Sequence, residues 1–128
     1  MTTKPLRENA GRQGMEITNA VVAVYREYLG RGPETARTLL HADAVVVVLG
    51  ETLTKAERRL VHDGEADAVI ALRRRFQQTM RDDLIGAVEA VLDRRVVSFM
   101  SDHTPDPDFA CEVFVLQPEN GQPLSAVV

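Results

Sequence analysis

The sequence is poor in cysteine and aromatic residues, and it has no long apolar run. Cys111 is the only cysteine among 128 residues, so no disulfide can form within the chain, and a reducing, cytoplasmic location is predicted. Tryptophan is absent and aromatic residues make up 5% of the chain, too few for the stacking platforms of RNA-binding proteins. The longest apolar run, Ala44 to Leu49, is far shorter than the ~20 residues of a bilayer-spanning helix. Direct membrane insertion is therefore not expected.

Positive charge is also scarce. The chain has 15 Lys and Arg against 19 Asp and Glu, a net charge of −4, whereas nucleic-acid binding needs clustered positive charge. Nucleic acid is therefore not expected as a partner. The basic residues do form local groups at Arg58–Arg59, Arg73–Arg75 and Arg94–Arg95, which leaves an anion-binding surface open.

The pattern predicts one domain over residues 15–116. Residues 1–14 are polar, contain a proline and two glycines, and lack periodicity, so they are predicted to form a flexible N-terminal tail. Residues 117–128 are predicted to form a C-terminal tail for the same reasons.

The first half of this domain predicts a helix and a hairpin. A helix from Met15 to Leu29 has an apolar stripe, and the Gly-Arg-Gly-Pro sequence that follows would end it. Thr35 to His41 and Ala44 to Leu49 are predicted strands on either side of a turn. The second strand is apolar at successive positions, so both of its faces should be covered. The domain's own helices would cover one face, and more of the chain or a second subunit would cover the other. The stripe of the helix is Ile17, Val21, Val24 and Tyr28.

The second half predicts two helices and another hairpin. Thr54 and Glu57 form a capping-box pattern that opens a helix to about His62. A helix over residues 65–92 would be ~42 Å long, so it must kink, for instance at Gly86, or project into a partner. Two more strands, over residues 95–101 and 109–116, flank a proline-containing loop.

The predicted architecture is an α+β fold in the order α-β-β-α-α-β-β. A four-stranded, mostly antiparallel sheet would carry helices on one face. Val21–Leu49 and Val88–Leu116 follow a similar course, so either a pseudo-twofold repeat or chance similarity relates the two halves.

Several short motifs between Met15 and Leu116 occur in an order that resembles a known family. They are Leu29-Gly-Arg-Gly-Pro33, Val45-Val-Val-Val-Leu49, Leu53-Thr-Lys-Ala-Glu57, Leu72-Arg73, and Ser101-Asp-His103 ahead of Val113-Phe-Val-Leu116. The chain resembles the bacterial MpsC family of unknown function, which includes YbcI-like proteins. The family is named after a Na+-translocating, membrane-potential-generating system. This resemblance implies a link to cation translocation or membrane energetics and supplies no catalytic residues.

Two groups of residues are candidate binding sites. An anion could contact the charge of Arg31 and the backbone amides that the glycines of Gly30-Arg-Gly-Pro33 expose. Helix termination explains the glycines and the proline equally well, and an ion pair or cap would explain Arg31 or Arg37. A metal would find suitable donors in the segment from Asp102 to Asp108. Its spacing matches no EF-hand, however, and Asp beside Pro is ordinary turn chemistry. The anion candidates are Arg31, Gly32, Arg37, Asp102 and His103, and the weak metal candidates are Asp102, His103, Asp106 and Asp108.

No catalytic residues and no cofactor are predicted. Glu57 is expected to cap a helix rather than act as a base, and Arg73 to Arg75 are expected to lie on a solvated helix face. Cys111 is expected to pack within a strand, and a catalytic pair with His103 is the weaker alternative.

The leading functional hypothesis is a non-enzymatic, homodimeric accessory or regulatory protein with a further, membrane-associated protein partner. It rests on the apolar strand, the long helix and the missing catalytic constellation. The alternative is a small-ligand or anion sensor. An enzyme is the least favoured of the three, because it would need a cleft that joins His103 to an acid or nucleophile.

Overall fold

The protein has the predicted order of helices and strands. The computed structural model describes residues 4–119, with side chains from residue 11 onward. The elements are α1 (Lys4–Leu29), β1 (Thr35–His41), β2 (Ala44–Gly50), α2 (Lys55–His62), α3 (Ala66–Leu92), β3 (Val96–Pro105) and β4 (Asp108–Leu116). The α+β prediction is confirmed.

The four strands form one sheet in the order β1-β2-β4-β3, and every neighbouring pair is antiparallel. Each half of the chain therefore contributes one hairpin, and β2 and β4 meet at the centre. Val46 lies opposite Val113 there. These two valines occupy corresponding positions of the two predicted repeat units, so the register agrees with a pseudo-twofold axis at this pair.

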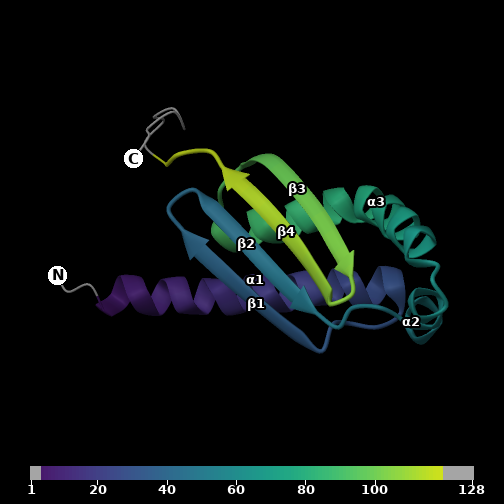
Figure 1. The fold of residues 1–128 in the computed structure, drawn as a ribbon. Helices are drawn as coiled ribbons and strands as arrows, with labels where there is room; N and C mark the ends of the chain where they lie inside the picture. Colours follow the sequence, from purple (N-terminus) through teal and green to yellow (C-terminus); the bar gives the residue numbers. More distant parts are fainter. Residues whose placement is uncertain (1–3, 120–128) are drawn as a thin grey trace.

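Helices α1 and α3 cover one face of the sheet, and the other face carries no helix (Figure 1). The side chains between the sheet and these helices form the hydrophobic core, which includes the tilted ring pair Phe99 and Phe114 at 5.1 Å. Its buried members are Ile17, Val21, Val24, Tyr25, Val45, Val47, Leu49, Met80, Leu84, Val88, Ala110, Phe114 and Leu116.

The first helix begins earlier than the sequence predicts. A non-helical segment was expected before Met15, but α1 is helical from Lys4 onward, so that prediction is wrong for residues 4–14. Pro5 lies in the first turn, where its missing N–H is not needed. Gly11 and Gly14 lower helix propensity without preventing the helix. Residues 1–3 of the predicted tail, and residues 120–128 of the C-terminal tail, lie outside the described part.

The third strand ends later than predicted. Residues 102–108 were expected to form a loop, but β3 continues to Pro105 and β4 begins at Asp108. Only Asp106 and Pro107, joined by a cis peptide bond, remain as the turn. β3 is an edge strand, so a proline at its end removes no hydrogen bond from the sheet.

The long helix α3 is continuous through Gly86, with no break at the predicted kink site. Its first turns extend past the end of the sheet beside α2 (Figure 1). The apolar residues at helical spacing along α3 are buried or half-buried, but Leu72, which the same spacing predicts to point inward, has a 42% exposed side chain. The next residue, Arg73, points inward instead and donates hydrogen bonds to the Glu57 carboxylate of α2.

Candidate functional site

Polar side chains gather where β2 leads into α2. The predicted capping box is present: the Thr54 hydroxyl accepts a hydrogen bond from the Glu57 amide at 3.2 Å, and the Glu57 carboxylate accepts one from the Thr54 amide at 2.8 Å. These contacts satisfy two amide groups that the start of a helix leaves free. Glu57 is therefore a cap, as predicted.

Glu57 also forms a buried ion pair with Arg73 of α3. The Arg73 guanidinium donates to both carboxylate oxygens, at 2.8 and 2.7 Å, and to the carbonyl oxygen of Thr52 at 2.7 Å. Burial would raise the pKa of Glu57, but the hydrogen bonds from Arg73 and Thr54 outweigh it and lower that pKa. Because Arg73 is only 3% exposed, the prediction that Arg73 to Arg75 form a solvated face is wrong at Arg73.

Asp108 connects the start of β4 to the same segment. One carboxylate oxygen accepts from the Thr52 hydroxyl at 3.1 Å and lies 2.8 Å from Nε2 of His103, and the other accepts from the Leu53 amide at 2.8 Å. An imidazole protonated at Nε2 donates to Asp108 and leaves Nδ1 as a buried acceptor without a partner in the described part of the chain. His103 and Asp108 thus hold the sheet end against the β2–α2 segment.

Glu112 lies in the middle of β4 and points into the core. It is fully buried, and it accepts a hydrogen bond of 2.6 Å from the Tyr25 hydroxyl of α1. Burial raises the pKa of Glu112 to about 7, while the Ser101 and Tyr25 hydroxyls oppose that shift. Its second oxygen has no partner among the described residues. Neither Tyr25 nor Glu112 was predicted as a site residue, although a lone glutamate at an inward position of an apolar strand was visible in the sequence.

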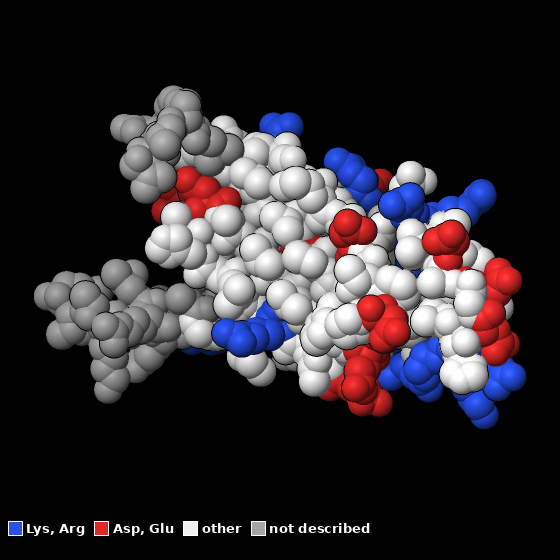
Figure 2. Space-filling model, viewed as in Figure 1, with Lys and Arg blue, Asp and Glu red and all other residues white. Residues whose placement is uncertain are grey.

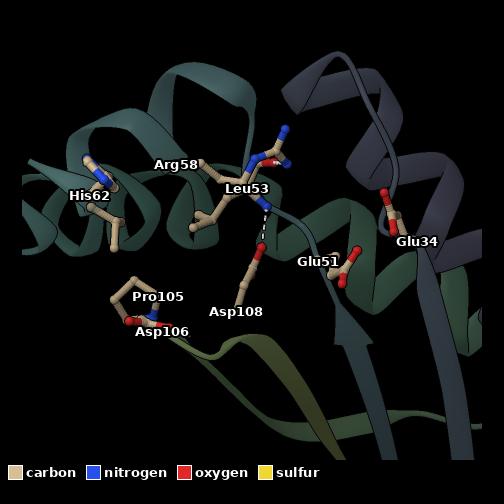
Figure 3. Close-up of a pocket in the computed structure, with 9 residues that line it drawn as sticks. Glu34, Glu51, Leu53, Arg58, His62, Pro105, Asp106 and Asp108 are labelled. Atoms are coloured by element: carbon tan, nitrogen blue, oxygen red, sulfur yellow. Dashed lines mark hydrogen bonds between the residues drawn. The ribbon is translucent and has the colours of Figure 1, made fainter.

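A pocket of about 550 Å³ opens beside this polar segment. Figure 3 shows side chains from the β2–α2 segment, from α2 and from the β3–β4 turn around it. Hydrogen bonding to Glu34 and the negative charge of Glu34 raise the pKa of Glu51. Arg58 donates to the Leu53 carbonyl at 3.0 Å. The pocket is lined by Glu34, Glu51, Leu53, Arg58, Val61, His62, Pro105, Asp106 and Asp108, so carboxylates dominate its charge.

The structure does not bring the predicted anion-site residues together. Gly30 ends α1 with a left-handed φ of 78°, and Arg31 donates to the Leu53 carbonyl and lies 3.9 Å from Glu34. Gly32 packs against the Arg26 side chain. The contacts of this segment therefore agree with the alternative explanation, in which the glycine ends a helix and Arg31 forms hydrogen bonds and an ion pair within the chain.

The remaining predicted residues lie on two faces of the sheet. Arg37 is exposed on the face without helices, and Asp102 lies on that face too, opposite Cys111. His103 is the next residue and points toward the helices, where it is 7% exposed. Cys111 and His103 are therefore separated by the sheet and cannot form a catalytic pair.

The weak metal candidates are brought together only in part, since His103 contacts Asp108 at 2.8 Å while Asp102 lies on the other face of the sheet. Among the side chains that the structure describes, residues 11–119, no group of three or more His, Cys, Asp and Glu could hold a metal ion. Asp108 is engaged by Thr52, Leu53 and His103, Asp106 lines the pocket, and Asp102 lies on the helix-free face.

The helix-free face of the sheet, which we call the open face, is the second feature with functional character. A row of apolar side chains crosses all four strands there, and its outer members Leu39 and Met100 are 47% and 52% exposed. Figure 2 shows the surface over the strands with few charged atoms. The row is Leu39, Val46, Val113 and Met100.

Comparison with known proteins identifies the family. A family model described as Na+-translocating membrane potential-generating system (MpsC) matches residues 10–118. The chain belongs to the MpsC family. No curated protein and no solved structure matches it.

Within residues 4–119 of this MpsC protein, no helix combines the length and apolar character needed to cross a bilayer.

Proposed function

We propose that this MpsC-family protein is a non-catalytic accessory or regulatory protein that acts as a homodimer by binding through the open face. The observation that carries this proposal is the apolar row across all four strands. Solvent-exposed apolar surface of this kind is typical of interaction sites, because its burial removes unfavourable contact with water.

The polar groups of the protein support the same proposal. A catalytic acid, base or nucleophile needs an atom that can reach a substrate. Arg73 and Glu57 instead pair with each other in the interior, and His103 pairs with Asp108. Their contacts join α2, α3 and the two hairpins, which is a structural role.

The family description suggests the process that such an accessory protein would serve. The description names a Na+-translocating, membrane-potential-generating system. We propose that the dimer acts in the cytoplasm on a membrane-associated protein partner of such a system, without entering the bilayer itself.

A complementation experiment tests this function. The gene is deleted in the cell that encodes it, and the membrane potential is measured with a voltage-sensitive dye in sodium and in potassium medium. Wild-type protein should restore a sodium-dependent component of the potential, and Val113→Asp should not, because a charge in the apolar row prevents association.

Leu60→Asp is the matched control, since Leu60 is an exposed apolar residue of α2, away from the open face. It should complement like the wild type. Equal potentials in the deletion strain and its parent would contradict the proposed process, and full complementation by Val113→Asp would contradict the role of the open face.

A small-ligand sensor is the second candidate function, favoured by the pocket in Figure 3. Its carboxylates favour a cationic ligand over the anion considered from the sequence. Thermal unfolding with spermidine and with sulfate distinguishes the two: a spermidine-induced rise in Tm that Glu51→Gln reduces supports a cation sensor. No rise with either ion contradicts a sensor for simple ions.

A further inference from the structure

The open face carries a pair of charges in addition to its apolar row. Next to that row, the strand pairing aligns Arg37 of β1, Val48 of β2, Cys111 of β4 and Asp102 of β3. Negative charge on Asp102 contributes to the raised pKa of Cys111, after burial and Glu112, which agrees with their position on one face. Arg37 and Asp102 therefore lie in one row at opposite edges of the sheet.

These two charges have no ion-pair partners within the described part of the chain. Neighbouring strands are ~4.8 Å apart, so three spacings separate Arg37 from Asp102 by roughly 14 Å. That distance is too long for an ion pair within one copy. In the paired rows of the open face they are the only Asp, Glu, Lys or Arg residues.

A second copy of the chain can satisfy both charges at once. We propose that two copies pack open face to open face about a twofold axis parallel to the strands. This rests on the proposed role of the open face. Such an axis places β1 of one copy over β3 of the other, so Arg37 lies over Asp102 of the second copy and Asp102 lies over the second copy's Arg37.

The same operation pairs the apolar side chains. Val46 lies over Val113 of the second copy, and Leu39 lies over Met100 of the second copy. Sheets that pack face to face are separated by ~10 Å, which suits interleaved side chains of this size. A twofold axis perpendicular to the strands would instead stack β1 on β1, and it would bring like charges together wherever the charged rows coincide.

The size of the face fits a dimer of modest affinity. Four strands of about seven residues cover roughly 19 Å by 24 Å. Two such faces together bury on the order of 1,000 Å², at the lower end for a specific protein interface. A dissociation constant in the micromolar range is therefore expected, and the reciprocal ion pairs would set the orientation of the copies more than the affinity.

Charge exchange tests this arrangement. Sedimentation velocity over a range of concentrations compares the wild type with Arg37→Asp, Asp102→Arg and the double variant. Each single variant should weaken the dimer about tenfold or more, because two ion pairs are replaced by repulsion, and the double variant should recover most of the wild-type affinity. Arg75→Asp on the exposed side of α3 is the matched control, and circular dichroism verifies the fold of each variant.

The outcomes separate this arrangement from the proposed function. If Val113→Asp abolishes the dimer while the single and double charge variants all dimerise as strongly as the wild type, the open face is the interface but the parallel axis is wrong. Stronger association of the single variants would also overturn the parallel axis. A wild-type monomer at tens of micromolar would overturn both the arrangement and the proposed homodimer. The arrangement is supported if both single variants lose affinity for the second copy and the double variant regains it.

Discussion

The two faces of the sheet differ in a way that alternation along the strands does not reveal. Val47 and Val48 are neighbours in β2, yet Val47 is fully buried under the helices while Val48 is half-buried on the open face. The inner face also holds the ionisable groups Glu112, His103 and Asp108, whereas the paired rows of the open face carry only Arg37 and Asp102. Sequence alternation thus assigns residues to a face, but what covers each face depends on the rest of the chain.

This contrast suggests different roles for the two faces. Hydrogen bonds on the inner side join α1 to β4, α2 to α3, and the β2–α2 segment to β4. Apolar groups on the open face lack such partners within the described chain, which is why association is proposed there. Four substitutions, the last two of them a matched pair, sharpen or break this comparison.

Arg73→Ala should have the largest effect, because it leaves the buried Glu57 carboxylate without its cation. Breaking one side of a buried ion pair costs about 3–5 kcal/mol, so a loss of that size is expected in the free energy of unfolding. Urea denaturation followed by circular dichroism measures it, with the exposed neighbour Arg74→Ala as control at about 0.5 kcal/mol or less. If the two variants were equally stable, the inner polar groups would not hold the fold together; Glu57→Gln gives a second test should Arg73→Ala not fold.

Glu112→Gln should raise stability at high pH. The pKa of Glu112 is about 7 in the folded protein against an ordinary value of 4.5, so between these values the folded state keeps a proton that the unfolded chain releases. Wild-type stability therefore falls as pH rises through this range. The variant still accepts from Tyr25, should match the wild type near pH 4, and should exceed it by about 2–3 kcal/mol at pH 8.

Urea unfolding at a series of pH values checks this prediction. The exposed Glu16→Gln is the control and should leave the pH dependence unchanged. If the free energy of unfolding changed with pH in the same way for the wild type and Glu112→Gln, ionisation of the buried Glu112 carboxyl would not destabilise the folded state.

Val47→Ala and Val48→Ala compare the two faces with the same chemical change. The first leaves a cavity in the core and should cost about 2 kcal/mol, and the second should cost under about 1 kcal/mol in the monomer. Thermal unfolding at several protein concentrations measures both. The proposed dimer predicts that the Val48→Ala deficit grows with concentration, and equal deficits at every concentration would remove the distinction between the faces.

Local features of the fold were predictable because neighbours in sequence determine them. The Thr54–Glu57 capping box, the Gly30 helix stop and both hairpins depend on contacts within a few residues. The helical start at Lys4 was not predicted, because glycine and proline lower helix propensity without forbidding a helix. β3 was predicted too short since an Asp- and Pro-rich segment suits both a turn and an edge strand.

The candidate site was less predictable, because its partners are distant in sequence. Glu57 meets Arg73 across 16 residues, Thr52 meets Asp108 across 56, and Tyr25 meets Glu112 across 87. Asp102 and His103 were placed in one candidate site because a loop was predicted there. Both lie in β3 instead, where adjacent residues point to opposite faces.

The sequence alone determined the order of helices and strands, their caps and turns, and membership of the MpsC family, because these depend on local pattern. The apolar run of Ala44 to Leu49 already indicated that both faces of that strand need cover. Only the tertiary structure decided which face α1 and α3 cover, that Arg73 rather than Leu72 turns inward, and that Arg37 and Asp102 share a row. Those outcomes depend on strand order and register, which join residues that no local pattern relates.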